Sequence, residues 1–182
     1  MVEIASVRMG SIEGRHAGTP LAAALPAAPC GRAVLRADAD GAVAAGTALG
    51  IGLDSPIGRS ATAEGLSALR LGPDEWLLVA DDERAIECDL AGGAHSLVDV
   101  SHRNTAFLVT GPRAAEALEH GCPRDLSLDA FPVGACCRTV LGKCEIVLWR
   151  GKADAFRVEV WRSFAPYAMD FLAEACRDAS LD

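Results

Sequence analysis

Two short apolar runs separated by a polar break, within residues 97–112, constrain the fold more than any other part of the sequence. In the first run, apolar and polar residues alternate over residues 98–101, which is the period of a strand with one buried face. The second run, residues 106–109, is continuously apolar and is typical of a buried strand. Gly111 and Pro112 end this strand, and a proline suits the first turn of a helix. The stretch therefore predicts two strands at the junction between two halves of the chain.

The half that precedes this junction alternates strand and helix patterns. The predicted strands are residues 32–36, 67–71, 75–80 and 94–101, and the predicted helices are 38–49 and 81–90. Gly72, Pro73 and Asp74 separate two of these strands and have the residue chemistry of a tight turn. This order of elements is the ferredoxin-like arrangement, in which two helices lie on one face of an antiparallel sheet.

The half that follows the junction has a similar order of predicted elements: strand, helix, strands and helix. The predicted strands are residues 104–110, 135–141, 145–149 and 155–161, with helices at 112–120 and from Ser163 onward. We therefore predict an α+β fold built from two ferredoxin-like halves of the βαββα type. In residues 1–29, glycines and prolines break every periodicity, so this segment is predicted to be an N-terminal arm and residues 30–182 the folded domain.

Composition excludes several classes of partner. The formal net charge of −8 opposes binding to nucleic acids and to anionic membrane surfaces. No apolar run approaches the about 18 residues of a membrane-spanning helix, and the charged N-terminal residues do not form a secretory signal. None of the seven cysteines forms a C-x-x-C pair, which favours buried thiols. We therefore expect a cytoplasmic protein.

Asp99, Ser101 and His102 are the residue types of a catalytic triad, but their positions disfavour that role. Strand alternation places Asp99 and Ser101 on one face and His102 on the other. The sequence also lacks the G-x-S-x-G pattern of a nucleophile elbow. We interpret the three residues as a strand end whose polar groups satisfy a break in the sheet.

The sequence lacks the spacings of a metal or dinucleotide site. The four histidines lie far apart, without the pairs that hold a metal ion. Gly46, Gly50 and Gly52 do not match G-x-G-x-x-G and come at the end of a predicted helix, where no phosphate would meet a helix N-terminus. We predict no catalytic, cofactor-binding or metal-binding residue in this chain.

Two tryptophans form the candidate partner interface. Alternation along residues 145–149 and 155–161 places Trp149 and Trp161 on the polar face of one sheet. Arg150 and Arg162 follow them in the sequence. Tryptophan and arginine together have the composition of an interface hot spot. The alternative is that an edge loop or the N-terminal arm covers both tryptophans.

Four segments carry a resemblance to a known family. They are residues 71–78 (LGPDEWLL), 98–104 (VDVSHRN), 121–126 (GCPRDL) and 156–165 (FRVEVWRSFA). In this order they resemble the gamma subunit of heterotetrameric sarcosine oxidase. That family is similar in fold to the folate-binding domain of glycine-cleavage aminomethyltransferases. The resemblance therefore implies that the two halves pack as one aminomethyltransferase folate-binding-like domain.

The resemblance also implies a function for the chain. The complex would consist of alpha, beta, gamma and delta subunits and would oxidise sarcosine to glycine, with tetrahydrofolate accepting the one-carbon unit and hydrogen peroxide formed. FAD, FMN, NAD and tetrahydrofolate would be bound by the partner subunits and none by this chain. This chain would be an accessory, non-catalytic gamma subunit, with the alpha subunit as its expected direct contact.

Two other functions remain open at this point. A free-standing folate-binding or aminomethyltransferase-like protein would need a carboxylate inside a folate-sized cavity, for which Asp99 is the candidate. A thiol activity could involve Cys136 and Cys137, which are adjacent on a predicted strand and therefore point to opposite faces.

Overall fold

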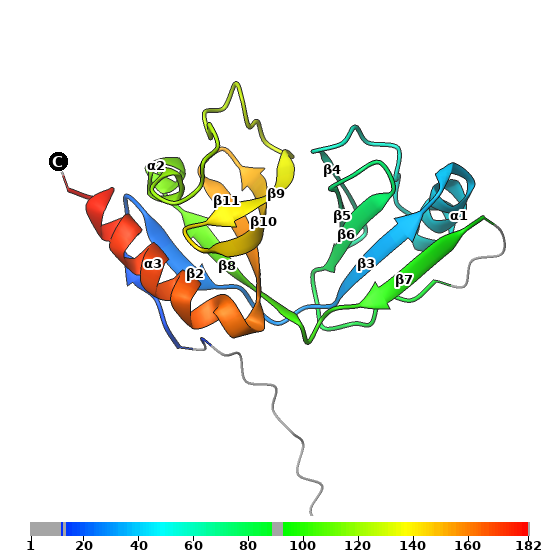
Figure 1. The fold of residues 1–182 in the computed structure, drawn as a ribbon, viewed down its shortest axis with the longest axis horizontal. Helices are drawn as coiled ribbons and strands as arrows, with labels where there is room; N and C mark the ends of the chain where they lie inside the picture. The colour runs from blue at the N-terminus through cyan, green and yellow to red at the C-terminus, as the bar shows by residue number, and fades with distance from the viewer. Residues whose placement is uncertain (1–11, 13, 89–92, 182) are drawn as a thin grey trace, which may run out of the picture.

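Two antiparallel sheets stand next to each other in the computed structural model, with the α-helices on the sides that face away from the junction (Figure 1). The structure describes residues 12, 14–88 and 93–181. The predicted α+β class, with two antiparallel halves, is confirmed.

The first sheet has six strands in the described part of the chain and contains the C-terminal half. Its order is β1 (Ala17–Gly18), β2 (Ala23–Pro26), β8 (Asn104–Thr110), β11 (Ala155–Trp161), β10 (Cys144–Lys152) and β9 (Cys136–Leu141). Helices α2 (Ala114–Glu119) and α3 (Ala165–Asp178) cover its outer face, and the 3-10 turn η1 (Arg162–Phe164) leads into α3 (Figure 1). Strand alternation turns Phe107, Ile146 and Val158 toward these helices, where they form the main core.

The second sheet has five strands among the described residues. Its order is β4 (Ser60–Ala63), β5 (Leu66–Arg70), β6 (Glu75–Ala80), β3 (Arg32–Ala37) and β7 (His95–Asp99). Helix α1 (Ala39–Leu49) lies on its outer face. Leu35, Trp76 and Leu78 are core residues on that side. Almost all of β6 is buried, because its other face meets the first sheet.

The polar break that the sequence shows between its two apolar runs joins the sheets. β7 ends at Asp99, the chain turns, and β8 begins at Asn104 in the other sheet. The bridge Arg59–Ala135 and a small apolar cluster, which includes Leu69, Leu77 and Val147, connect the inner faces. The predicted junction between two halves is thus where the sheets meet.

Three local predictions differ from the structure. Residues 81–88 are not helical, so the helix predicted over 81–90 is wrong there, and its last two residues lie outside the described ones. The predicted loop at 52–65 contains β4, whose weak strand sequence is stabilised by pairing with β5. Residues 17–26 of the expected arm form a small hairpin of β1 and β2, and β2 pairs with β8 of the first sheet. Its first eleven residues and residue 13 lie outside the described part.

Candidate functional site

Trp149 and Trp161 do lie on the same face of the first sheet, as the alternation predicted. Trp149 on β10 is paired with Arg157 on β11, so the two side chains lie on the same face. Trp161 lies four residues after Arg157 on β11 and therefore shares that face. This face, however, is the one that meets the second sheet. Trp149 Nε1 donates a hydrogen bond of 3.0 Å to Ser60 Oγ on β4, and its half-buried ring packs on the cluster between the sheets. The second sheet, rather than a loop or the arm, covers Trp149.

Arg150 lies on the opposite face of β10 and is buried in the main core. Its Nη1 and Nη2 atoms donate to the carbonyl oxygens of Phe131 and Leu126, at 2.7 and 2.6 Å. The guanidinium carbon is 4.3 Å from the centroid of the Phe156 ring. Arg150 therefore ties the loop after α2 to the sheet. The predicted partner interface of Trp149, Trp161 and their flanking Arg150 and Arg162 is therefore corrected, because Arg150 is internal and Trp149 is half-covered.

Trp161 and Arg162 remain at the surface, at the end of β11. Trp161 is 44% exposed and its ring stacks on that of Phe164, which is 43% exposed, with centroids 6.1 Å apart. The guanidinium carbon of Arg103 lies over the Trp161 ring, 5.3 Å from the ring centroid. We call Arg103, Trp161, Arg162 and Phe164 the Trp161 patch. Sequence reasoning missed Arg103 and Phe164, although residue 164 lies one helical turn after 161.

A buried ionic network crosses the junction close to this patch. Arg32 Nε and Arg157 Nε each donate to one carboxylate oxygen of Glu159, at 2.7 and 2.8 Å. Arg157 Nη2 also donates to Cys30 Sγ at 3.1 Å. Burial raises the pKa of the Cys30 thiol, against the opposing effect of Arg157. These charges are engaged with one another and link β3 of one sheet to β11 of the other.

The three residues that resembled a triad close the strand ends at the junction. Ser101 Oγ accepts a hydrogen bond from the backbone N–H of Arg32 and donates to the carbonyl of the same residue. The Asp99 carboxylate accepts from the backbone N–H of Ser101 at 2.7 Å. His102 is exposed. These contacts agree with the interpretation of a strand end, because the side chains of Asp99 and Ser101 make hydrogen bonds to backbone N–H and C=O groups at the break in the sheet.

The thiols of Cys136 and Cys137 are poorly suited to nucleophilic chemistry. Burial raises the pKa of Cys136 to about 12 and also raises that of Cys137. Because the thiolate is the nucleophile, both groups are in the unreactive form at neutral pH. Within residues 12, 14–88 and 93–181, no group of acidic, histidine and cysteine side chains is arranged to hold a metal ion. None of the helices described there is long and apolar enough to cross a membrane.

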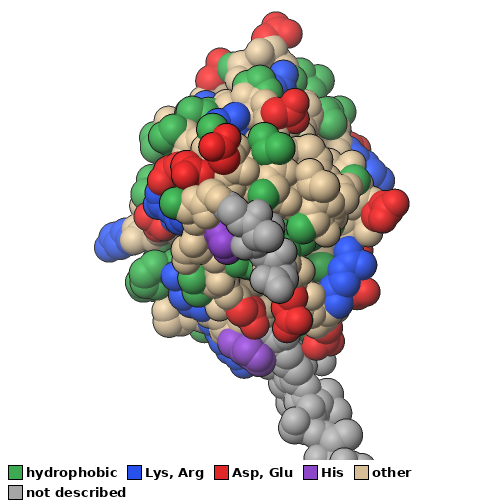
Figure 2. Space-filling model, turned by 90° about the vertical axis from the view of Figure 1, so that its right-hand side faces the viewer, with side chains coloured by type: hydrophobic (Ala, Val, Ile, Leu, Met, Phe, Trp, Pro, Cys, Tyr) green, Lys and Arg blue, Asp and Glu red, His purple; other side chains and the backbone are tan. Residues whose placement is uncertain are grey.

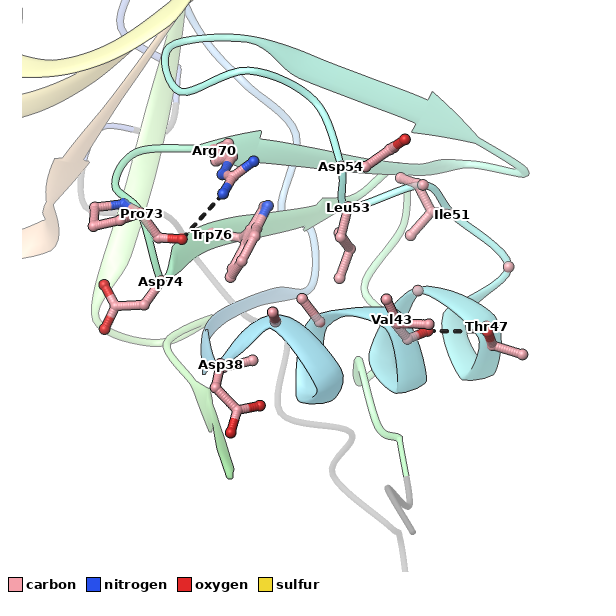
Figure 3. A pocket seen from close by; sticks show the side chains of 16 residues that line it. Asp38, Val43, Thr47, Ile51, Leu53, Asp54, Arg70, Pro73, Asp74 and Trp76 are labelled. Atoms are coloured by element: carbon pink, nitrogen blue, oxygen red, sulfur yellow. Dashed lines mark hydrogen bonds between the residues drawn. The ribbon is translucent and has the colours of Figure 1, made fainter. Parts of the chain in front are cut away.

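A pocket of about 820 Å³ opens between α1 and the second sheet (Figure 3). Ala42, Val43 and Gly46 form its helix side, and Trp76 and Arg70 lie across from them. The Trp76 side chain is 2% exposed, and its Nε1 atom has no hydrogen-bond partner. We call this pocket the Trp76 groove.

Three carboxylates and one guanidinium define the charge of the Trp76 groove. The acidic residues that line it are Asp38, Asp54 and Asp74. Hydrogen bonds from the backbone N–H groups of Gly41 and Ala94 hold the pKa of the Asp38 carboxyl below its ordinary value. The Arg70 guanidinium donates to the carbonyl oxygens of Ser55 and Pro73, at 2.7 and 3.1 Å, and lies 5.1 Å from the Trp76 ring centroid. Arg36, which lies outside the lining, forms an ion pair of 3.0 Å with Asp74. The excess negative charge of the groove therefore lies at Asp38 and Asp54.

Comparison with known proteins finds one family whose model matches most of the chain. The model for the sarcosine oxidase gamma subunit family matches residues 36–178. The sarcosine oxidase subunit gamma of Corynebacterium sp. (strain U-96) is 32% identical over 154 residues, which cover 82% of this chain and 74% of that protein. The corresponding subunit of Arthrobacter sp. is 31% identical over 140 residues, or 74% and 69% of the two chains.

Two solved structures resemble the chain as a whole. A chain of the heterotetrameric sarcosine oxidase from Corynebacterium sp. U-96, in complex with pyrrole 2-carboxylate, superposes with a TM-score of 0.81 and 26% identity, over 94% of this chain and 92% of that one. The glycine cleavage system aminomethyltransferase T from Bartonella henselae superposes with a TM-score of 0.59 and 14% identity, over 85% and 48%. The second likeness concerns the fold, which agrees with the expected folate-binding-like domain.

Proposed function

Because the chain belongs to the sarcosine oxidase gamma subunit family, we propose that it acts as the accessory, non-catalytic subunit of a heterotetrameric sarcosine oxidase. Its partners are the alpha, beta and delta subunits, and alpha is its direct contact. The assembled enzyme oxidises sarcosine to glycine, passes the one-carbon unit to tetrahydrofolate and forms hydrogen peroxide. FAD, FMN, NAD and tetrahydrofolate are bound by the partner subunits.

The exposed Trp161 patch is the observation that carries this proposal. Stacked aromatic rings flanked by arginines have the composition of residues that dominate binding energy at interfaces. The patch is cationic although the chain as a whole has a net charge of −8. It therefore suits a partner surface that offers an apolar pocket with carboxylates around it.

The buried charges of the chain support an accessory role in a second way. Arg32, Arg157 and Glu159 bind one another across the junction, and Arg150 binds backbone carbonyls. Such groups stabilise the arrangement of the two sheets. Free thiols are found at Cys30, Cys122, Cys136, Cys137, Cys144 and Cys176, which supports the cytoplasm as the compartment because thiols stay reduced there.

Removing the Trp161 patch tests the proposal. The variant with both Trp161→Ala and Arg103→Ala is co-expressed with the other three subunits, and the complex is isolated through a tag on the alpha subunit. We expect at least about a tenfold loss of this chain from the complex, because truncating a central aromatic anchor typically costs about 2 kcal/mol or more. Thermal unfolding of the isolated variant checks that its fold is intact.

The matched control is Leu128→Ala, which truncates a side chain that is 52% exposed elsewhere on the surface. We expect this variant to assemble in full amount. Normal assembly of the double variant would contradict the proposed docking surface. Binding of tetrahydrofolate at micromolar concentration by the isolated chain, or turnover of sarcosine by it, would instead favour a free-standing folate-binding or aminomethyltransferase-like protein.

A further inference from the structure

The Trp76 groove exists because α1 presents small side chains to the sheet. The helix has the sequence ADGAVAAGTAL, and Ala42, Gly46 and Thr47 are among the residues that line the groove. Protein interiors normally close such gaps to crystal-like density. Here the gap of about 820 Å³ stays open beside a helix of eleven residues, whose length is about 16 Å.

Trp76 carries an unused hydrogen-bond donor in this groove. Its Nε1 atom is buried and has no partner, whereas buried polar groups are nearly always bonded. Figure 3 shows the indole nitrogen directed toward the space between Arg70 and Leu53. Arg70 cannot accept this hydrogen bond, because a guanidinium is a donor only. The missing partner is therefore an acceptor oxygen.

The mouth of the groove combines apolar and acidic side chains. Val43 is 72% exposed at the rim. Asp38 and Asp74 lie toward one end and Asp54 toward the other (Figure 3). Seen from the side of α1, the surface shows acidic and basic side chains interspersed around exposed backbone and hydrophobic side chains (Figure 2). The groove therefore suits an apolar occupant with positive charge at its ends.

We propose that the Trp76 groove binds an extended segment from another subunit of the oxidase. The segment has apolar side chains over about five residues, which is what 16 Å accommodates at the rise of a strand. Lysine or arginine residues flank it and face the aspartates, and one of its main-chain carbonyls accepts the hydrogen bond of Trp76 Nε1. This proposal rests on the proposed function, because that function supplies the partner.

The shape and the polar groups favour a peptide over a small molecule. The groove follows the helix from the capping residue Asp38 to Gly50 at its other end. An elongated groove with carboxylates at both ends and one buried donor matches a chain that carries repeated carbonyl oxygens.

Trp76→Phe is the first test, because it removes the N–H and keeps an aromatic ring. In the isolated chain the substitution removes an unsatisfied buried N–H, which is favourable, and loses packing of the larger ring, which is unfavourable, so the melting temperature should change little. In co-expression with the other subunits, recovery of this chain in the complex should fall about two- to tenfold, the value of one neutral hydrogen bond. A lower melting temperature together with full assembly would show that Trp76 has a structural role only.

Val43→Asp is the second test, and it does not depend on a buried residue. It places a charge at the exposed rim and should reduce assembly about tenfold or more. Leu128→Asp is the matched control, because it changes another exposed aliphatic side chain outside the groove. A photo-crosslinking residue in place of Val43 should attach to an apolar segment of a partner subunit that lies next to lysine or arginine.

The remaining outcomes separate this inference from the proposed function. If the Trp161 variants lose assembly while both groove variants assemble normally, the groove proposal is overturned and the accessory function stands. If neither set of variants affects assembly, both proposed docking surfaces are overturned, while recovery of the chain with the other subunits still supports the accessory function. A cross-link to this chain or to a second copy of it, or a small molecule retained in the groove by native mass spectrometry, would also overturn the proposed occupant.

Discussion

Arg150 has the largest side chain among the fully buried residues of the described structure. A charged group in a core is costly unless it is hydrogen-bonded, and Arg150 makes two hydrogen bonds, through Nη1 and Nη2, to carbonyl oxygens of the loop after α2, while its Nε has no partner. Burial lowers its pKa, but a guanidinium remains charged in a protein. The residue acts as a clamp between a loop and a sheet.

Replacing Arg150 by methionine tests this role. The side chain of methionine fills similar space but leaves the carbonyls of Leu126 and Phe131 without donors. We expect the free energy of unfolding to fall by about 2–4 kcal/mol, which urea denaturation would measure. Arg162→Met, on an exposed arginine, should change it by no more than about 0.5 kcal/mol. Equal effects of the two substitutions would rule out the clamp.

At the scale of the element, α1 ends in a glycine-dependent turn. Asp38 caps its first turn, and Gly50 ends it with φ of +67°, in the left-handed region. The Gly50 N–H bonds back to the carbonyls of Gly46 and Thr47. This end of the helix sets the path of the chain into Ile51 and Leu53, which line the Trp76 groove.

Gly50→Ala should therefore lower the free energy of unfolding by about 1 kcal/mol through backbone strain. A Cβ atom at this position meets no atom within 4 Å, so crowding adds nothing. Gly50→Asn should cost less, because asparagine tolerates the left-handed conformation better than alanine. Thermal or urea unfolding compares the three proteins. An alanine variant as stable as the asparagine variant would contradict the assigned strain.

At the scale of the whole molecule, the two sheets are joined by a charge network as well as by apolar contacts. Glu159 is 2% exposed and lies between Arg32 and Arg157, with one guanidinium on each carboxylate oxygen. Arg32 belongs to β3 of the second sheet, whereas Glu159 belongs to β11 of the first. The network is thus a buried polar link that spans the junction, beside the ion pair of Arg138 with Glu75 and the hydrogen bond of Trp149 with Ser60.

Glu159→Ala should destabilise the protein strongly, because it leaves two buried guanidinium groups without their carboxylate. The expected loss is about 3–5 kcal/mol in the free energy of unfolding. Asp170→Ala is the control, since it removes one partner of an exposed ion pair with Arg15 and should cost no more than about 1 kcal/mol. Urea denaturation checks both. A loss at residue 159 as small as at residue 170 would show that the charge network contributes little to joining the sheets.

Much of the fold could be predicted from local pattern. The strands that alternate, such as β11, and the turn at residues 72–74 were found because a two-residue period and turn chemistry are local properties. β4 was missed because its sequence becomes a strand only through pairing with β5. The helix expected after Asp81 is absent from residues 81–88, because a capping residue cannot stabilise a helix that lacks an apolar face to pack.

The sequence by itself determined which side chains share a strand face, and the four family segments placed the chain in its family. It could not determine what covers each face. Trp149 and Trp161 are on one face as predicted, yet packing of the second sheet covers the first and leaves the second exposed. The Trp76 groove has no local signal either, because it depends on the distance between α1 and a sheet. Face alternation is set by the backbone, whereas burial and cavities are set by contacts between residues that are far apart in sequence.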